Sequence, residues 1–385
     1  MTMILEKIKR LDPVMTIAWI LAIISVFFIH PDKEYVNYID FRSLGILWGL
    51  MIIIQGLKKE NVFDLLANKL IRKFNKDWQL MAVLVFICFF SSMLITNDVA
   101  LITFVPIAIM ILKGADKENL LIPVIVLQTV AANLGSMLTP IGNPQNLYMY
   151  GKTGMSLISF CGIMFPFSLV SFIGLVLAIF IVNKTAVSVN SLEKSVEKDL
   201  ENKNEVDKLS TDNRGKLAIL LFSLAFIVAI LTVVRIVPYL YFDAVVLIII
   251  LLMDRELIAS ADYTLLLTFI GFFIFTGNMG RLDLVRELLE KLMNGREFII
   301  ALITSQFISN VPATLMLSGF TTCYKELIIG VNVGGLGTLI ASMASLISYK
   351  AYTKEYKENT GKYMKEFTLT NLIFLAILVI LWVIL

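Results

Sequence analysis

The sequence predicts an all-α protein that crosses a membrane several times. Of its 385 residues, 58% are hydrophobic and only 16% are charged, and the mean hydropathy is +0.83. Soluble domains carry about 25% charged residues, so this composition lies well outside their range. Apolar runs of about 17–25 residues, the length that crosses a bilayer, recur along most of the chain.

A second observation is that one unusual segment occurs twice, at residues 132–147 and 331–346. Aligned side by side, the copies pair Asn133 with Asn332, Gly135 with Gly334, Thr139 with Thr338 and Ile141 with Ile340, and they place Asn143 and Asn146 opposite Ser342 and Ser345. One such segment, rich in glycine and small polar residues, is equally consistent with close helix packing. A matched pair of interrupted apolar segments, one in each half, is typical of the binding site of a secondary transporter.

Two other stretches, 78–112 and 296–323, predict helical hairpins, because each contains two apolar arms around a polar tip. The segments 119–150 and 325–349, which contain the two copies, are expected to be broken membrane helices. The remaining predicted spans are 13–29, 41–57, 155–183, 215–235, 238–253, 262–279 and 365–385. The amphipathic segments 61–75 and 282–293 are expected to lie along the membrane surface.

These elements divide the chain into two transmembrane repeats, at residues 1–183 and 236–385. A polar cytoplasmic linker at 184–214 and one connecting transmembrane helix at 215–235 lie between them. The first repeat makes four crossings and the connecting helix a fifth, so the second repeat starts on the opposite side and has inverted topology. Most of the 33 Lys and Arg residues then lie inside. This bias favours a multi-pass protein of the cytoplasmic membrane with its N-terminus inside and its C-terminus outside.

The composition argues against catalysis. His30 is the only histidine, and the three cysteines lie apart in apolar stretches. The sequence contains neither a metal-ligand cluster nor a nucleophile motif nor a Walker A segment. We therefore expect no enzyme, no ATP-driven pumping by this chain alone, no cofactor and no nucleic-acid partner.

The hairpin tips read Thr96-Asn97-Asp98 and Ser309-Asn310-Val311. A carboxylate at membrane depth costs about 2.5–3.5 kcal/mol or more unless it is paired, so Asp98 is expected to hold a cation or a proton. The alternative is that Asp98 caps the backbone N–H groups of the second hairpin arm. Asp243 is a weaker candidate, because it lies near the start of its helix and is expected to cap it.

The breaks in the duplicated segments supply further polar groups. A helix that stops inside a membrane leaves backbone groups that protein, water or ligand must satisfy. Half-helix N-termini suit an anion, whereas unwound carbonyls and half-helix C-termini suit Na⁺. In the first copy Pro140 and Pro144 remove two N–H donors and Gly142 permits close backbone approach.

The motifs at 96–101, 135–146 and 309–314 resemble the ion transporter superfamily, most closely the arsenite-permease/NhaD and citrate-transporter-like anion permeases. The divalent anion:sodium symporters are similar at a greater distance. In those symporters each tip carries a Ser-Asn-Thr triplet that holds substrate and helps to form a Na⁺ site. The chain departs from this triplet at Asp98 and Val311. The resemblance implies an elevator mechanism and a homodimer.

The sequence therefore predicts a secondary active transporter of a small anion, a carboxylate or oxyanion, coupled to Na⁺ or H⁺. The predicted substrate-binding residues are Thr96, Asn97, Asn143, Gln145, Asn146, Ser309, Asn310, Thr338, Ser342 and Ser345. The predicted coupling-ion residues are Thr96, Asn97, Asp98, Asn133, Thr139, Gly142, Ser309, Asn310 and Asn332, and no metal site is expected beyond this possible Na⁺ site. The alternatives are a Na⁺/H⁺ antiporter that uses Asp98 as the exchanging carboxylate, and a channel, which would show no ion-coupled accumulation.

Overall fold

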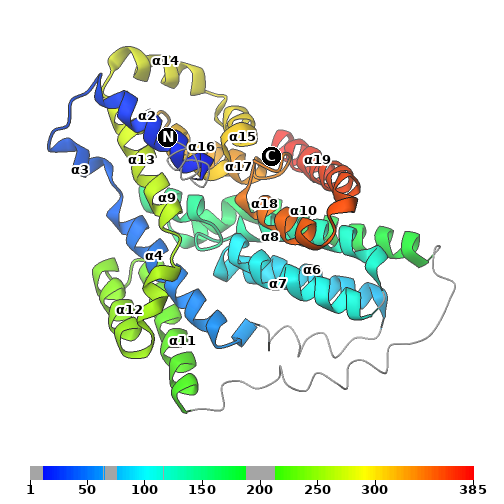
Figure 1. Cartoon of the computed structure of the whole chain (residues 1–385). Helices are drawn as coiled ribbons and strands as arrows, with labels where there is room; N and C mark the ends of the chain where they lie inside the picture. Colours follow the sequence, from blue (N-terminus) through cyan, green and yellow to red (C-terminus); the bar gives the residue numbers. More distant parts are fainter. Residues whose placement is uncertain (1–11, 64, 66–75, 116, 188–212) are drawn as a thin grey trace, which may run out of the picture.

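The computed structural model describes residues 12–63, 65, 76–115, 117–187 and 213–385, and every regular element in this part of the chain is helical (Figure 1). The helices are α2 Pro13–Val26, α3 Glu34–Tyr38, α4 Phe41–Lys59, α6 Asp77–Ile95, α7 Asn97–Gly114, η1 Glu118–Leu120, α8 Leu121–Ser136, α9 Pro144–Thr153, α10 Leu157–Val187, α11 Asn213–Val233, α12 Tyr239–Met253, η2 Arg255–Ser260, α13 Tyr263–Gly280, α14 Asp283–Met293, α15 Glu297–Ile308, α16 Asn310–Leu317, α17 Tyr324–Val333, α18 Met343–Glu355, η3 Lys357–Asn359 and α19 Thr360–Ile384.

The predicted fold class is confirmed. Within the described residues, eight helices are long and apolar enough to cross a membrane: α4, α6, α7, α8 with η1, α10, α11, α13 and α19 with η3. The amphipathic segment 282–293 is helix α14, which exposes Leu284, Leu288 and Leu292. Most of the predicted surface segment 61–75 and of the linker 184–214 lies outside the described residues.

The helices form two groups that lie side by side (Figure 1). The first group, which we call the frame, consists of α2, α4, α11, α12 and α13. The second group, the hairpin bundle, consists of α6 to α10 and α15 to α19. The two groups meet mainly where α13 packs against α16 and where α4 packs against α9.

Both predicted breaks are present, between α8 and α9 and between α17 and α18. In the first break Pro144 is the first residue of α9, where its missing N–H costs nothing. Asn143 caps this helix, because its side chain accepts from the backbone N–H of Asn146 at 3.0 Å. In the second break Gly337 takes a φ of +107°, which side-chain-bearing residues rarely adopt.

The second half of each broken helix packs on the other repeat. Helix α9 lies against α16 and α17, whereas α18 lies against α7 and α8. The two broken helices therefore exchange partners at their breaks. Any site at the breaks must contain residues from both repeats.

The duplication seen in the sequence extends to the backbone of the hairpins. Thr96 and Ser309, the tip residues, have nearly the same conformation, with φ/ψ of 70°/150° and 73°/154°. The next residue of each tip donates its N–H to the broken helix, Asn97 to the carbonyl oxygen of Gly142 at 3.1 Å and Asn310 to that of Ala341 at 2.9 Å. Gly142 and Ala341 occupy the same position in the aligned copies.

The first arms of the two hairpins are also docked alike. The hydroxyl of Thr139 donates to the carbonyl oxygen of Met93, and the hydroxyl of Thr338 donates to that of Gln306 at 2.9 Å. Met93 and Gln306 each lie three residues before their tip. The hairpin tips and breaks of the two halves therefore have the same local structure, and the division of the chain into two repeats of inverted topology stays a prediction.

The hairpins differ in length. Helices α15 and α16 contain 12 and 8 residues, or about 18 and 12 Å at 1.5 Å per residue. These arms are shorter than the hydrocarbon core of about 30 Å, so neither is long enough to cross it. Helices α6 and α7, with 19 and 18 residues, are each long enough to cross.

Gly135 allows α8 to approach α6 closely. A Cβ atom at this position would lie well inside contact distance of the carbonyl oxygen of Phe89, a backbone atom that cannot move aside. We predict that Gly135→Ala lowers the free energy of unfolding by about 1–3 kcal/mol, the usual effect of overpacking, measured as the thermal midpoint in detergent. Gly162→Ala is the matched control, because a Cβ there meets nothing within 4 Å; equal midpoints for the two variants would contradict the prediction.

Candidate functional site

Four helices of the described chain begin at one small pocket. The residues that line it lie at the N-termini of α7, α9, α16 and α18, apart from one residue of α13. They are Asn97, Asp98, Pro144, Gln145, Leu265, Asn310, Val311, Ser342 and Met343. The pocket has a volume of about 10 Å³, just enough for one water-sized sphere. Both tips and both breaks therefore meet at one place, which is closed in this conformation.

The electrostatics of the pocket come from helix ends and one carboxylate. Each helix N-terminus carries the equivalent of about half a positive charge, and no Lys, Arg or His is among the lining residues. Asp98 places an oxygen, Oδ1, in a buried position without a hydrogen-bond partner in the described structure. The same holds for Oε1 of Gln145. The pocket thus combines four positive helix ends, which attract an anion, with two residues whose buried acceptors have no partner and attract a cation or a donor.

Asn133, near the end of α8, connects the first tip to the opposite repeat. Its Oδ1 accepts from Nδ2 of Asn97 at 3.1 Å and from the hydroxyl of Ser342 at 2.9 Å. Its Nδ2 donates to Oγ of Ser345 at 3.3 Å. One buried amide therefore holds the start of α18 against the tip of the first hairpin.

Asn332, its counterpart near the end of α17, does the same for α9. Its Nδ2 donates to Oδ1 of Asn146 at 2.7 Å, and its Oδ1 accepts from Nδ2 of Asn143 at 3.2 Å. Asn143 also donates to Oγ of Ser136 at 3.2 Å. Asn133 and Asn332, which are aligned in the two copies, thus each form hydrogen bonds between the repeats. We call these two residues the cross-braces.

The predicted site residues fall into three sets. Those that line the pocket are Asn97, Asp98, Gln145, Asn310 and Ser342. Those that lie behind the lining and hydrogen-bond to one another are Asn133, Asn143, Asn146, Asn332 and Ser345. Those that dock the hairpins on the breaks are Thr139, Gly142, Ser309 and Thr338, and Thr96 is the tip residue itself, with a φ of 70°.

Two polar residues of the site were not predicted. Ser136 accepts from Asn143, and it lies within the first copy of the duplicated segment. Gln306 donates from Nε2 to the carbonyl oxygens of Gly334 at 2.9 Å and Leu336 at 3.0 Å, and it accepts from the N–H of Thr338 at 3.0 Å. The available signal was an amide within an otherwise apolar hairpin arm, three residues before the tip.

Neither aspartate behaves as a simple helix cap. Asp98 makes no cap, because it is the second residue of α7, the N-cap is Thr96, and Oδ1 of Asp98 accepts no hydrogen bond. The expectation that Asp243 caps its helix was wrong, since α12 begins at Tyr239 after Pro238, a cap without a side-chain hydrogen bond. Asp243 lies one turn further in, with its carboxylate next to Gly45 of α4.

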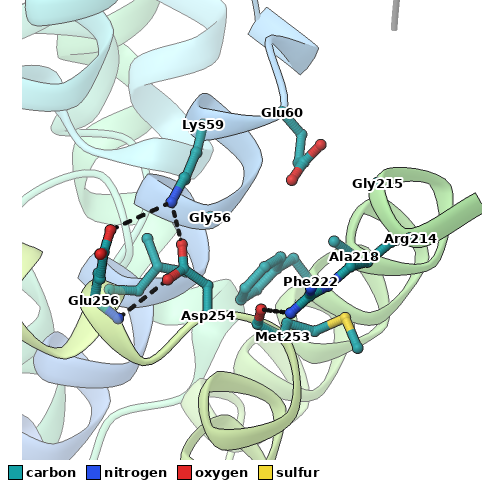
Figure 2. Close-up of a pocket in the computed structure, with 11 residues that line it drawn as sticks. Gly56, Lys59, Glu60, Arg214, Gly215, Ala218, Phe222, Met253, Asp254 and Glu256 are labelled. Atoms are coloured by element: carbon teal, nitrogen blue, oxygen red, sulfur yellow. Dashed lines mark hydrogen bonds and ion pairs between the residues drawn. The ribbon is translucent and has the colours of Figure 1, made fainter. Parts of the chain in front are cut away.

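A larger and more open pocket lies elsewhere, at the end of α4 and the start of α11 (Figure 2). Lys59 there contacts Asp254 and Glu256, and Arg214 donates to the carbonyl oxygen of Met253 at 3.0 Å. None of the predicted site residues lines it. Size alone therefore does not identify the site; the pocket at the hairpin tips is the one in which the two repeats meet.

A model of the citrate transporter family matches residues 1–322 of the sequence. The chain belongs to the citrate transporter family. This confirms the resemblance to anion permeases and shows a membrane transporter rather than an enzyme.

Relatives of known name agree with this membership. An uncharacterized transporter of Methanocaldococcus jannaschii is 31% identical over 322 residues, which cover 82% of each chain. The inner membrane protein YbiR of Escherichia coli is 29% identical over 334 residues, 85% of this chain and 84% of its own. A silicon efflux transporter of rice (Oryza sativa) is 32% identical over 142 residues, 36% of this chain and 28% of its own.

We predict that Asn133→Ala destabilises the protein by about 1–3 kcal/mol, because it leaves Nδ2 of Asn97 and the hydroxyls of Ser342 and Ser345 without their buried partner. The measurement is the thermal midpoint in detergent. Ser348→Ala is the control, since this buried hydroxyl donates only within its own helix, to the carbonyl oxygen of Ala344. A loss no larger than in Ser348→Ala would show that the cross-brace does not hold the repeats together.

Proposed function

We propose that this member of the citrate transporter family is a secondary active transporter of a small anion, coupled to Na⁺ or H⁺. The observation that carries the proposal is the convergence of four helix N-termini on one pocket without a cationic side chain among its lining residues. Helix N-termini bind anions through free N–H groups and the positive end of the dipole. Transporters with discontinuous membrane helices bind anionic substrates in this way.

The coupling ion would bind beside the substrate. Asp98 has an unpaired oxygen at the pocket, and a proton or Na⁺ at this oxygen would remove a charge that opposes anion binding. Main-chain carbonyls at the breaks offer further oxygen ligands, since each has a second lone pair beyond its present hydrogen bond. Thr96, Asn97, Thr139, Gly142, Ser309 and Asn310, which lie at the two tips and at the first break, would contribute to such a site.

The pocket is closed in this conformation, because a space of about 10 Å³ admits a water-sized group and none of the candidate anions. Binding of an oxyanion, a short carboxylate or citrate therefore requires the pocket to open.

We further propose an elevator mechanism, in which the hairpin bundle moves against the frame in the cytoplasmic membrane, with the N-terminus inside and the C-terminus outside. The division into two groups of helices, with few elements in contact between them, supports this proposal. A homodimer would form through the frame, whose helices α11 and α12 expose apolar side chains such as Leu220, Ile227, Leu240 and Ile248.

A second candidate function, Na⁺/H⁺ antiport, is favoured by Asp98 alone. An unpaired carboxylate at membrane depth is a site for alternate binding of a proton and Na⁺. In this case the neutral amides around the pocket would serve the cation, and no anion would be carried.

Removal of either tip amide is expected to abolish uptake. Asn97→Ala and Asn310→Ala each remove a group that lines the pocket, so we expect uptake of radiolabelled arsenite, phosphate, sulfate or citrate into proteoliposomes to fall at least 10-fold for whichever of these is carried. Asn371→Ala is the control, because this buried amide donates within its own helix, to Phe367 at 2.9 Å. Intact uptake in both tip variants would refute the proposed site.

Thermal shift separates symport from antiport. We expect an anion to stabilise the purified protein only when Na⁺ is present or the pH is low, and we expect Asp98→Asn to remove this dependence on the cation. Asp243→Asn is the control, since Asp243 also holds a buried unpaired oxygen but lies away from the pocket. Stabilisation by Na⁺ alone, insensitive to every anion and lost in Asp98→Asn, would favour the antiporter.

A further inference from the structure

Helix α9 is the half-helix that brings Gln145 to the pocket, and its opposite end is held by hydrogen bonds from the frame. Its N-terminus lies at the pocket and its C-terminus ends at Gly154, which has a left-handed φ of +67°. A helix of ten residues is about 15 Å long. A displacement at one end of so short a helix therefore moves the other end as well.

Arg235, which follows α11 in the frame, forms these hydrogen bonds. Its Nη1 donates to the carbonyl oxygen of Gly154 and its Nη2 to that of Tyr150, both at 2.6 Å. The guanidinium also stacks on the ring of Tyr150, at 4.6 Å from the ring centroid. A positive charge at the C-terminus of a helix complements its dipole. Arg235 therefore satisfies two carbonyl groups at the end of α9 and offsets the negative end of the helix dipole.

The backbone of Arg235 shows that this side chain matters. Arg235 has a φ of +67°, and the N–H groups of Arg235 and Ile236 bond back to Thr232 and Leu231. This is the Schellman arrangement that ends a helix, and its left-handed position is normally occupied by glycine. An arginine there is strained. Glycine at position 235 would end α11 without this backbone strain.

Arg42 extends the connection to α4. Its Nη2 donates to the carbonyl oxygens of Thr232 and Val233, both at 3.3 Å, at the C-terminus of α11. Gly151 of α9 packs against Ser43 and the guanidinium of Arg42. Two arginines thus join the ends of three helices in series, α4 to α11 and α11 to α9, and of their hydrogen bonds those of Arg235 cross from the frame to the hairpin bundle.

We propose that Arg235 is a positioning residue that latches the substrate half-helix α9 to the frame in this conformation and releases it during the transport cycle. The release rests on the proposed function, in which the bundle moves; the positioning does not. Arg235 is exposed, so water can replace both of its hydrogen bonds when α9 leaves. A buried arginine would leave unsatisfied groups behind and could not serve as a reversible contact.

Arg235→Gly tests the positioning. Glycine relieves the left-handed strain at the end of α11 and removes the side chain, so we expect a thermal midpoint equal to or above that of the wild type. Hydrogen–deuterium exchange of a peptide covering 144–156 should nevertheless become at least fivefold faster. Lys152→Ala, which removes an exposed cation from the last turn of α9 itself, is the control and should exchange like the wild type.

Two outcomes overturn the positioning role. Unchanged exchange in 144–156 would show that Arg235 does not hold α9. A lower midpoint, with faster exchange throughout α4 and α11, would show that Arg235 only stabilises the frame.

A reversible cross-link tests the release. Thr153→Cys and Arg235→Cys are joined by a flexible bis(methanethiosulfonate) of about the reach of an arginine, which forms one disulfide with each cysteine and releases methanesulfinate, in a background with Cys88→Ala, Cys161→Ala and Cys323→Ala. We expect the cross-link to lower Na⁺- or pH-driven uptake of arsenite, phosphate, sulfate or citrate at least 10-fold, and a reducing agent to restore it. Undiminished uptake in the cross-linked protein would overturn the latch alone. If the reduced protein carries none of these anions, the proposed function and the release fail together, and the exchange experiment still decides the positioning.

Discussion

The structure depends on one constraint, that every backbone group left free where a helix stops inside the membrane must find a partner within the protein. Four half-helices and two hairpin tips create many such groups in a small volume. In the first break the side-chain amide of Asn146 meets the carbonyl oxygens of Ser136, Met137 and Thr139, at 3.3–3.4 Å. Without it the end of α8 would leave carbonyls unpaired in an apolar interior, at a cost of about 1–3 kcal/mol each.

The second break meets the same constraint with a different residue. Ser345 stands where the first copy has Asn146, and its hydroxyl is too short to reach the carbonyls at the end of α17. Gln306, which lies in α15, the first arm of the second hairpin, supplies the missing amide and donates to the carbonyl oxygens of Gly334 and Leu336. The two repeats thus preserve the backbone geometry, while the side chains that satisfy it come from different helices. This accounts for a glutamine in an otherwise apolar arm.

The sequence was sufficient to predict the elements of the fold, because the constraint leaves a local mark. Glycine, proline and small amides within an apolar run identify a break wherever it occurs, and both copies of the segment lie at breaks. The hairpins were likewise predictable from a polar tip between apolar arms. Most of the predicted surface segment 61–75 and most of the linker 184–214 lie outside the described residues and stay predictions.

The partners across the breaks could not be predicted in the same way. Nothing near Asn133 or Asn332 in the sequence indicates that each binds the half-helix of the opposite repeat, since these contacts join residues about 190–210 positions apart. The same is true of Leu265, which reaches the pocket from the frame. The prediction for Asp243 was wrong for a related reason. Its position near the start of an apolar run indicated a helix cap, whereas α12 begins four residues earlier, at Tyr239.

The pocket itself breaks the symmetry of the repeats, and this has a chemical consequence. The first repeat contributes Asp98 and Gln145, with their unpaired acceptors, whereas the positions aligned with them are Val311 and Ala344. The four positive helix ends are shared, but the two unpaired acceptors both come from the first repeat. Because α9 packs on α16 and α7 packs on α18, Gln145 and Asp98 lie beside different helices of the second repeat. A cation or a proton donor is attracted toward these acceptors, and the second repeat offers no counterpart to them. The duplicated segments thus share their helix ends but not their side chains, so a ligand that carries both a donor and an anionic group cannot bind equally well in two orientations.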